Sequence, residues 1–240
     1  MLQEMSKLHS KKWKKAVAFL RLCREEFHRS RGEEWANGIT HLVGTVFSIT
    51  ALVLMVVSSA IHGTAWHVVS CSIYGATLIL LTLCSGLYHL LKGFRAKRVF
   101  QIFDHCTIYL LIAGTYMPFT FITMNHNAMG WTIFGIEWGL ALCGVLIETL
   151  FPKIVKYASL PIYLIMGWLL LINIKEFLAN IPTGGLVMLT VGGLLYTIGV
   201  IFYLMDYTPY MHTIWHVFVL GGIVCQWVCV MFWVIPTYGE

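Results

Sequence analysis

Charged residues are scarce in this chain. Asp, Glu, Lys and Arg make up 11% of its 240 residues, against about 25% in soluble domains, so a soluble globular protein is excluded. The seven cysteines form no CxxC pair and lie mostly inside apolar stretches. Buried free cysteine behaves as a small hydrophobic residue, and we predict no disulfide framework. The N-terminal region also lacks the apolar core and cleavage site of a signal peptide.

Hydrophobic residues make up 58% of the sequence and gather in seven runs. Each run has about the 20 residues that a helix needs to cross a bilayer, and is longer than a barrel strand of roughly 10 residues. We therefore expect an all-α membrane protein, a seven-transmembrane helix bundle. The expected spans are 38–60, 66–91, 102–123, 131–150, 157–174, 184–205 and 211–235.

The basic residues are distributed unevenly between the two sides of these spans. Of the 16 Lys and Arg residues, all but Lys175 fall in the first 36 residues or in the connections after the second and fourth spans. Because basic loops stay in the cytoplasm, we expect the N-terminus in the cytoplasm and the C-terminus outside. The net charge of +5 expresses this asymmetry, and we expect no nucleic-acid partner.

Two parts of the chain are expected, a basic cytoplasmic N-terminal tail over 1–36 and a seven-helix transmembrane domain over 37–240. In the tail, Trp13, Val17 and Leu20 fall on one helical face, which fits an amphipathic helix on the membrane surface. A solvated tail that only sets the orientation of the chain fits the composition equally well. Both interpretations stay open.

Five polar residues occupy one depth of the expected bundle. Ser85 and His89 lie near the end of the second span, Asp104 opens the third, and His212 and His216 open the seventh. Residues four apart share a helix face, and three histidines with a free fourth position are a ligand set of catalytic zinc. We therefore predict Zn²⁺ bound by His89, His212 and His216. Asp104 would act as general base, and Ser85 would hydrogen-bond the water or oxyanion. The simpler alternative is that these histidines only hydrogen-bond across helices.

Other polar residues in or near the spans are weaker candidates for a functional site. His41 opens the first span and is expected to support the same site, whereas His105 points about 100° away from the preceding aspartate. Glu137 has no obvious partner, and Glu148 lies near basic residues of the following connection. His67 is expected to be solvated on the outer side.

Five stretches between about residues 33 and 220 form a specific set of motifs. They are Glu33-Glu34-x-x-Asn37-x-x-Thr40-His41, Ser85-x-x-x-His89, Phe103-Asp104-His105, Ala113-Gly114-Thr115-Tyr116-Met117-Pro118-Phe119 and His212-x-x-x-His216. In these stretches the chain resembles the hemolysin III family, the bacterial branch of the progestin and adipoQ receptor (PAQR) superfamily. The resemblance implies seven helices, a cytoplasmic N-terminus and a location in a bacterial inner (plasma) membrane. It also implies zinc bound by His89, His212 and His216, with Asp104 and Ser85 beside the metal. One position departs from the pattern, because Gln226 stands where bacterial members often have a further histidine.

The resemblance also implies an activity. Eukaryotic relatives are linked to hydrolysis of ceramide or other lipid amides, and the wider superfamily includes alkaline ceramidases. The first hypothesis is therefore a zinc-dependent hydrolase that acts on membrane lipids. The second is a non-catalytic sensor or regulator of membrane homeostasis, in which zinc is a structural staple; both need the same ligands. A pore-forming hemolysin is a third hypothesis, disfavoured because seven spans without a secretion signal are typical of a permanent membrane protein.

Overall fold

The computed structural model describes residues 29–125 and 127–236. No β-strand is present among these residues. Seven helical stretches within them are long and apolar enough to cross a membrane, which confirms the predicted all-α, seven-helix fold. The stretches are Arg31–His62, Ala65–Leu90, Phe94–Thr123, Ala128–Leu150, Tyr157–Asn180, Thr183–Leu204 and Met211–Val234. The amphipathic helix expected in the tail lies outside the described residues.

The spans are built from eight α-helices and three short segments of other helix types in the described part of the chain. In order they are α2 (Arg31–His62), α3 (Ala65–Leu90), α4 (Phe94–Pro118), the π-helix η1 (Phe119–Thr123), α5 (Ala128–Leu150), α6 (Pro152–Gly167), the 3₁₀-helix η2 (Leu169–Asn173), α7 (Ile174–Asn180), α8 (Thr183–Leu204), α9 (Met211–Cys229) and the π-helix η3 (Val230–Val234).

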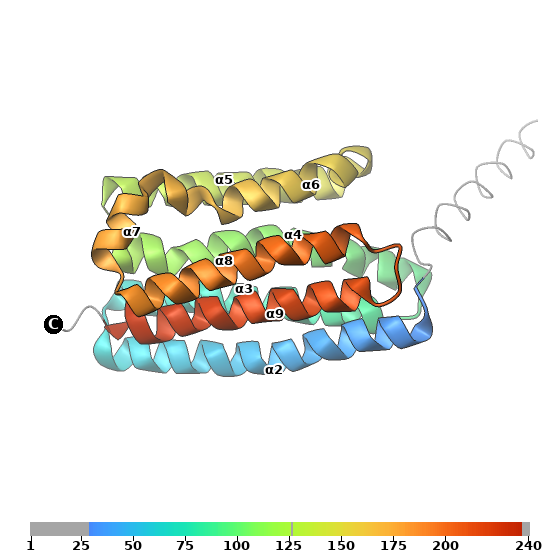
Figure 1. Cartoon of the computed structure of the whole chain (residues 1–240), viewed down its shortest axis with the longest axis horizontal. Helices are drawn as coiled ribbons and strands as arrows, with labels where there is room; N and C mark the ends of the chain where they lie inside the picture. The colour runs from blue at the N-terminus through green and yellow to red at the C-terminus, as the bar shows by residue number, and fades with distance from the viewer. Residues whose placement is uncertain (1–28, 126, 237–240) are drawn as a thin grey trace, which may run out of the picture.

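Most helices pack against their neighbours in sequence. The packing order is α6, α5, α4, α3, α2, α9 and α8, so α9 returns to pack beside α2, and α8 packs on α9. In Figure 1, α2 and α9 form one side of the bundle, and α5 and α6 form the opposite side. Because the connections are short, the start of α2, the end of α3 and the start of α9 meet at one end. We call this end, which includes the 91–93 and 205–210 connections, the basic end.

The start of α2 is fixed by its own sequence. Ser30 and Glu33 form a capping box: the Ser30 N–H donates to Glu33 Oε2 over 2.8 Å, and the Glu33 N–H donates to Ser30 Oγ over 3.2 Å. This arrangement satisfies two N–H groups that the first turn of a helix leaves unpaired. The helix therefore begins at a defined residue, and the following carboxylate and histidine side chains have fixed positions at the basic end.

Burial follows the pattern of a membrane bundle. Tyr74, Leu78 and Ile223 are fully buried where helices meet, whereas large apolar side chains such as Val46 and Leu142 are exposed on the outer faces. Exposed apolar surface of this extent suits contact with lipid rather than water. The exposed position expected for His67 is wrong, because its side chain is buried and its Nδ1 accepts a hydrogen bond from the Thr64 N–H at the start of α3.

Candidate metal centre

The three predicted ligand histidines come together at the basic end of the bundle. His89 lies in the last turn of α3, and His212 and His216 lie one turn apart at the start of α9. All three are buried, and each offers a ligand atom within 4.8 Å of the others. Their ring centroids are 4.5 to 5.3 Å apart. These three side chains are therefore close enough to hold one metal ion.

The spacing of the nitrogens fits tetrahedral coordination. His216 Nε2 and His89 Nε2 are 3.1 Å apart. Two nitrogens bound at 2.0–2.1 Å to one tetrahedral zinc ion are about 3.3 Å apart. A small outward movement of the two rings is enough to reach that geometry, so the arrangement of these donors fits a zinc ion.

The other ring nitrogen of each histidine faces a polar group. His89 Nδ1 lies 2.8 Å from Glu34 Oε2, and His216 Nδ1 lies 2.5 Å from His41 Nε2. Such partners fix the orientation of a histidine ring and raise its basicity as a ligand. Glu34 and His41 are seven residues apart, so one face of α2 supports two of the three histidines. His41, which was expected to support the same site, therefore contacts one of its three histidines.

The third histidine is held from the 205–210 connection. His212 Nδ1 lies 3.5 Å from Asp206 Oδ1 and 3.1 Å from Arg29 Nη2. Arg29 in turn donates to both oxygens of Asp206, over 3.2 and 2.5 Å. Burial lowers the pKa of Arg29, but Tyr88 and Asp206 raise it by more, so its pKa lies above the ordinary value. The guanidinium is therefore charged at this site.

The start of α2 closes the basic end over the histidines. Glu34 accepts a salt bridge from Lys97 at the start of α4 over 2.7 Å, as well as contacting His89. Glu33 Oε1 accepts a hydrogen bond from the Tyr210 N–H over 2.8 Å. Three separate parts of the chain are thus joined around the cluster by the residues that open α2.

Asp104 and Ser85 lie beside the cluster without belonging to it. Both are buried, and Asp104 interacts electrostatically with His89 and with Ser85. Ser85 therefore lies next to the Asp104 carboxyl group, whereas His41 Nδ1 and Asn37 Nδ2 have no hydrogen-bond partner among the described residues. Buried polar atoms are normally hydrogen-bonded, so a polar group of a ligand or a water molecule would satisfy these two atoms.

A second polar cluster lies on the other side of α4. His105 Nδ1 contacts Glu148 Oε1 of α5, and the Ser159 hydroxyl of α6 donates to Glu148 Oε2 over 2.9 Å. The side chain of His105 thus contacts α5, in keeping with its predicted direction about 100° away from Asp104 on the helix. The contacts that Glu148 makes were not expected from the sequence, because its partners are 43 and 11 residues away.

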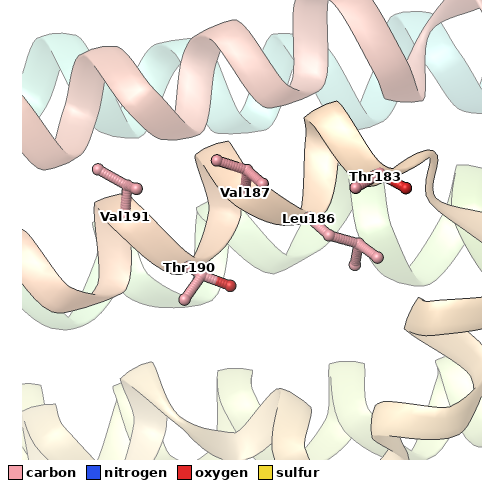
Figure 2. A pocket seen from close by; sticks show the side chains of 5 residues that line it. All are labelled: Thr183, Leu186, Val187, Thr190 and Val191. Atoms are coloured by element: carbon pink, nitrogen blue, oxygen red, sulfur yellow. The ribbon is translucent and has the colours of Figure 1, made fainter.

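A shallow hollow elsewhere on the surface is not part of the centre. Figure 2 shows that it is lined by five side chains of α8, which are Thr183, Leu186, Val187, Thr190 and Val191. These residues lie at the end of α8 away from the 205–210 connection and include no titratable group. The hollow therefore offers none of the chemistry of the histidine cluster.

The fold and the cluster define a multi-pass integral membrane protein with a buried group of three histidines that can hold a metal ion. Residues 29–227 match the family described as haemolysin-III related. The chain is 43% identical over 205 residues to Hemolysin-3 of Bacillus cereus, which covers 85% of this chain and 93% of the relative. It is 41% identical over 205 residues to the Hemolysin-3 homolog of Bacillus subtilis (strain 168), covering 85% and 96%. The chain therefore belongs to the haemolysin-III-related family.

A more distant relative extends the similarity to animals. The human Monocyte to macrophage differentiation factor is 29% identical over 200 residues, which cover 78% of each chain. The residues matched by the family begin at Arg29, and they include every residue of the cluster and its partners. The family therefore shares the part of the chain that forms the candidate metal centre.

Proposed function

We propose that the histidine cluster holds one zinc ion through His89, His212 and His216. The observation that carries the proposal is that each of these rings faces a separate polar partner through Nδ1. The three histidines are buried, each offers one nitrogen within 4.8 Å of the others, and zinc accepts neutral imidazole well. Three protein ligands leave a fourth position for a water molecule or a substrate, as in catalytic zinc sites.

We propose further that the protein hydrolyses an amide bond of a membrane lipid. When bound, zinc polarises a carbonyl group and makes water a better nucleophile near neutral pH. Asp104 would accept the proton of the attacking water and pass it to the leaving nitrogen as the C–N bond breaks. The Ser85 hydroxyl would donate a hydrogen bond to the substrate oxygen. The burial of both side chains, and the position of Asp104 next to Ser85 and His89, support these roles.

A second candidate is a non-catalytic protein in which zinc joins helices. The observation that favours it is the set of contacts that already ties the start of α2 to the other parts of the basic end. Arg29 binds Asp206, Glu34 binds Lys97, and Glu33 accepts from the Tyr210 N–H. A zinc ion held between α3 and α9 would strengthen the same assembly, which would suit a sensor or regulator of the membrane.

We place the basic end on the cytoplasmic side of a bacterial inner (plasma) membrane. The support is the positive-inside rule, since all the basic residues except Lys175 lie in the first 36 residues, in the 91–93 connection or in the first turns of α4 and α6. The two Bacillus relatives are consistent with a bacterial membrane protein. The lipid substrate would then be cut near the cytoplasmic surface.

The experiment that tests hydrolysis compares Asp104→Asn with wild type. The asparagine keeps the shape of the side chain and removes the base, so the variant should bind the same amount of zinc and lose about 10²–10⁴-fold of its turnover. Both proteins are placed in lipid bilayers with a panel of ceramides and other acyl amides, and released fatty acid is quantified.

Two control variants distinguish the loss of the general base from the loss of the folded protein or of its metal site. Glu148→Gln removes another buried carboxylate next to α4 and should retain turnover, because Glu148 contacts His105 and Ser159 rather than the cluster. His89→Ala gives the background without an intact metal site. Fatty-acid release by the wild type no higher than by His89→Ala, across the whole panel, would support the non-catalytic candidate instead.

A further inference from the structure

Glu137 of α5 is a buried carboxyl group with no hydrogen-bond partner. Its exposed fraction is 0%, and neither oxygen is hydrogen-bonded among the described residues. The residue lies nine positions after the first residue of α5, about 14 Å along the helix, and therefore within the apolar layer. An ionised carboxylate at this depth is costly unless a positive charge or hydrogen bonds compensate it. Glu137 must therefore hold a proton or be neutralised by a bound cation.

Helix α4, which packs against α5, is irregular near its C-terminal end. Pro118 lies inside α4 and has no N–H to donate to the preceding turn. The next N–H, that of Phe119, bonds to Tyr116 O, three residues back, and the chain continues as the π-helix η1. Such π-helical turns often occur at functional sites. Backbone oxygens in this part of α4 therefore do not all accept the hydrogen bonds of a regular α-helix.

A second broken helix lies next to the first. The fifth span changes from α6 to the 3₁₀-helix η2 after Gly167. The Tyr116 hydroxyl connects the two irregular regions, because it donates to Met166 O over 2.9 Å and accepts from the Leu170 N–H over 3.0 Å. Tyr116 also interacts electrostatically with Glu137. Glu137 lies on the same buried face of α5 as Gly130 and Gly144. A methyl group added at Gly130 would meet Thr120 O, and one at Gly144 would meet the Tyr109 ring, so this face packs against α4. The carboxyl group therefore faces the part of α4 that precedes the irregular turn.

We propose that Glu137 binds a sodium ion in exchange with a proton at this position. Carboxylate, carbonyl and hydroxyl oxygens are suitable ligands for a hard cation, and interrupted membrane helices supply backbone oxygens to Na⁺ and proton sites. Tyr116 is the titratable group that faces Glu137 from α4, and η1 contains none. Among the described residues of α6, the titratable side chain nearest the break in sequence is Tyr163, which interacts with Glu148 rather than Glu137.

The site is separate from the metal centre. Glu137 is 11 residues from Glu148 on the same helix, about 16 Å along its axis, and it contacts none of the histidines that could hold a metal. The proposal therefore does not depend on the proposed hydrolysis, and either can fail while the other holds.

The test uses dicyclohexylcarbodiimide, which adds the O–H of a protonated carboxyl group across one of its C=N bonds and prefers apolar surroundings. Purified full-length protein in detergent is treated over a range of pH, and the labelled residue is identified by peptide mass spectrometry. Glu137 should be labelled, and the rate should fall as the pH rises. At a Na⁺ concentration ten times its dissociation constant, the rate should fall about 11-fold by simple competition, whereas choline at equal ionic strength should leave it unchanged.

Two variants show which carboxyl group carries the label. Glu137→Gln should remove the label, and Glu148→Gln should retain both the label at Glu137 and its protection by Na⁺. Labelling of Glu137 that Na⁺ does not slow would overturn the proposal. So would the absence of labelling at Glu137 in folded wild-type protein that becomes labelled there only after denaturation, because such a carboxyl group would not exchange its proton in the native state.

Discussion

Substitution of Glu34 tests how the polar partners of the histidines support metal binding. Glu34 Oε2 lies 2.8 Å from His89 Nδ1, and this carboxylate is the acidic partner of that ring. Loss of such a partner typically lowers metal affinity 10–100-fold, which corresponds to about 1.4–2.7 kcal/mol of binding free energy. Glu34→Gln keeps an acceptor oxygen but removes the charge, so we expect about a tenfold loss. Glu34→Ala removes both and should approach a 100-fold loss.

The affinity is measured by competition with a chelating dye of known zinc affinity, using purified protein in detergent. Glu33→Gln is the matched control. Glu33 is the adjacent carboxylate, accepts from Ser30 and Tyr210, and contacts none of the three histidines. The account predicts an unchanged zinc affinity for Glu33→Gln. An unchanged affinity for Glu34→Ala, or equal losses for Glu33→Gln and Glu34→Gln, would refute the idea that Glu34 acts through His89.

Two further predictions concern packing and orientation. Gly130→Ala should destabilise the bundle by roughly 1–3 kcal/mol, because a methyl group there would lie 2.6 Å from the backbone oxygen of Thr120; Gly139→Ala meets nothing within 4 Å and should not destabilise it. Thermal unfolding in detergent compares the two, and a Gly130→Ala protein as stable as Gly139→Ala would contradict the close helix contact. Reporter fusions at residue 240 should be active outside the cytoplasm, as the positive-inside rule predicts, and an active cytoplasmic reporter there would reverse the orientation.

Hydropathy predicted the spans because crossing a membrane requires long apolar runs, and these runs dominate this sequence. The expected spans 38–60 and 211–235 correspond to helical stretches Arg31–His62 and Met211–Val234. The extra residues at the start of the first helix come from the Ser30 capping box, which adds a polar turn that hydropathy does not detect. Helix ends that depend on local hydrogen bonds are therefore the least predictable part of this fold.

The position of the histidine cluster could also be predicted, because helix periodicity and alternating span direction bring the same helix ends together. The partners of the cluster could not. Arg29 and Asp206 are 177 residues apart and meet only through the packing of α2 beside α9. Polar residues next to a membrane span are common for reasons of solvation alone, so the sequence does not indicate that these two residues form a pair. The spacing of Glu34 and His41 was the one available signal, since residues seven apart lie on one face of a helix.

The central claim is that His89, His212 and His216 bind one zinc ion, and metal analysis of the purified protein tests it most directly. The protein is prepared without chelators, and zinc is quantified by mass spectrometry against protein concentration. We expect about one zinc ion per chain in the wild type, since one cluster of three ligands is present among the described residues. We expect most of this zinc to be lost in the His212→Ala/His216→Ala double variant. A folded wild-type protein without zinc, or a double variant that retains the full amount, would contradict the claim.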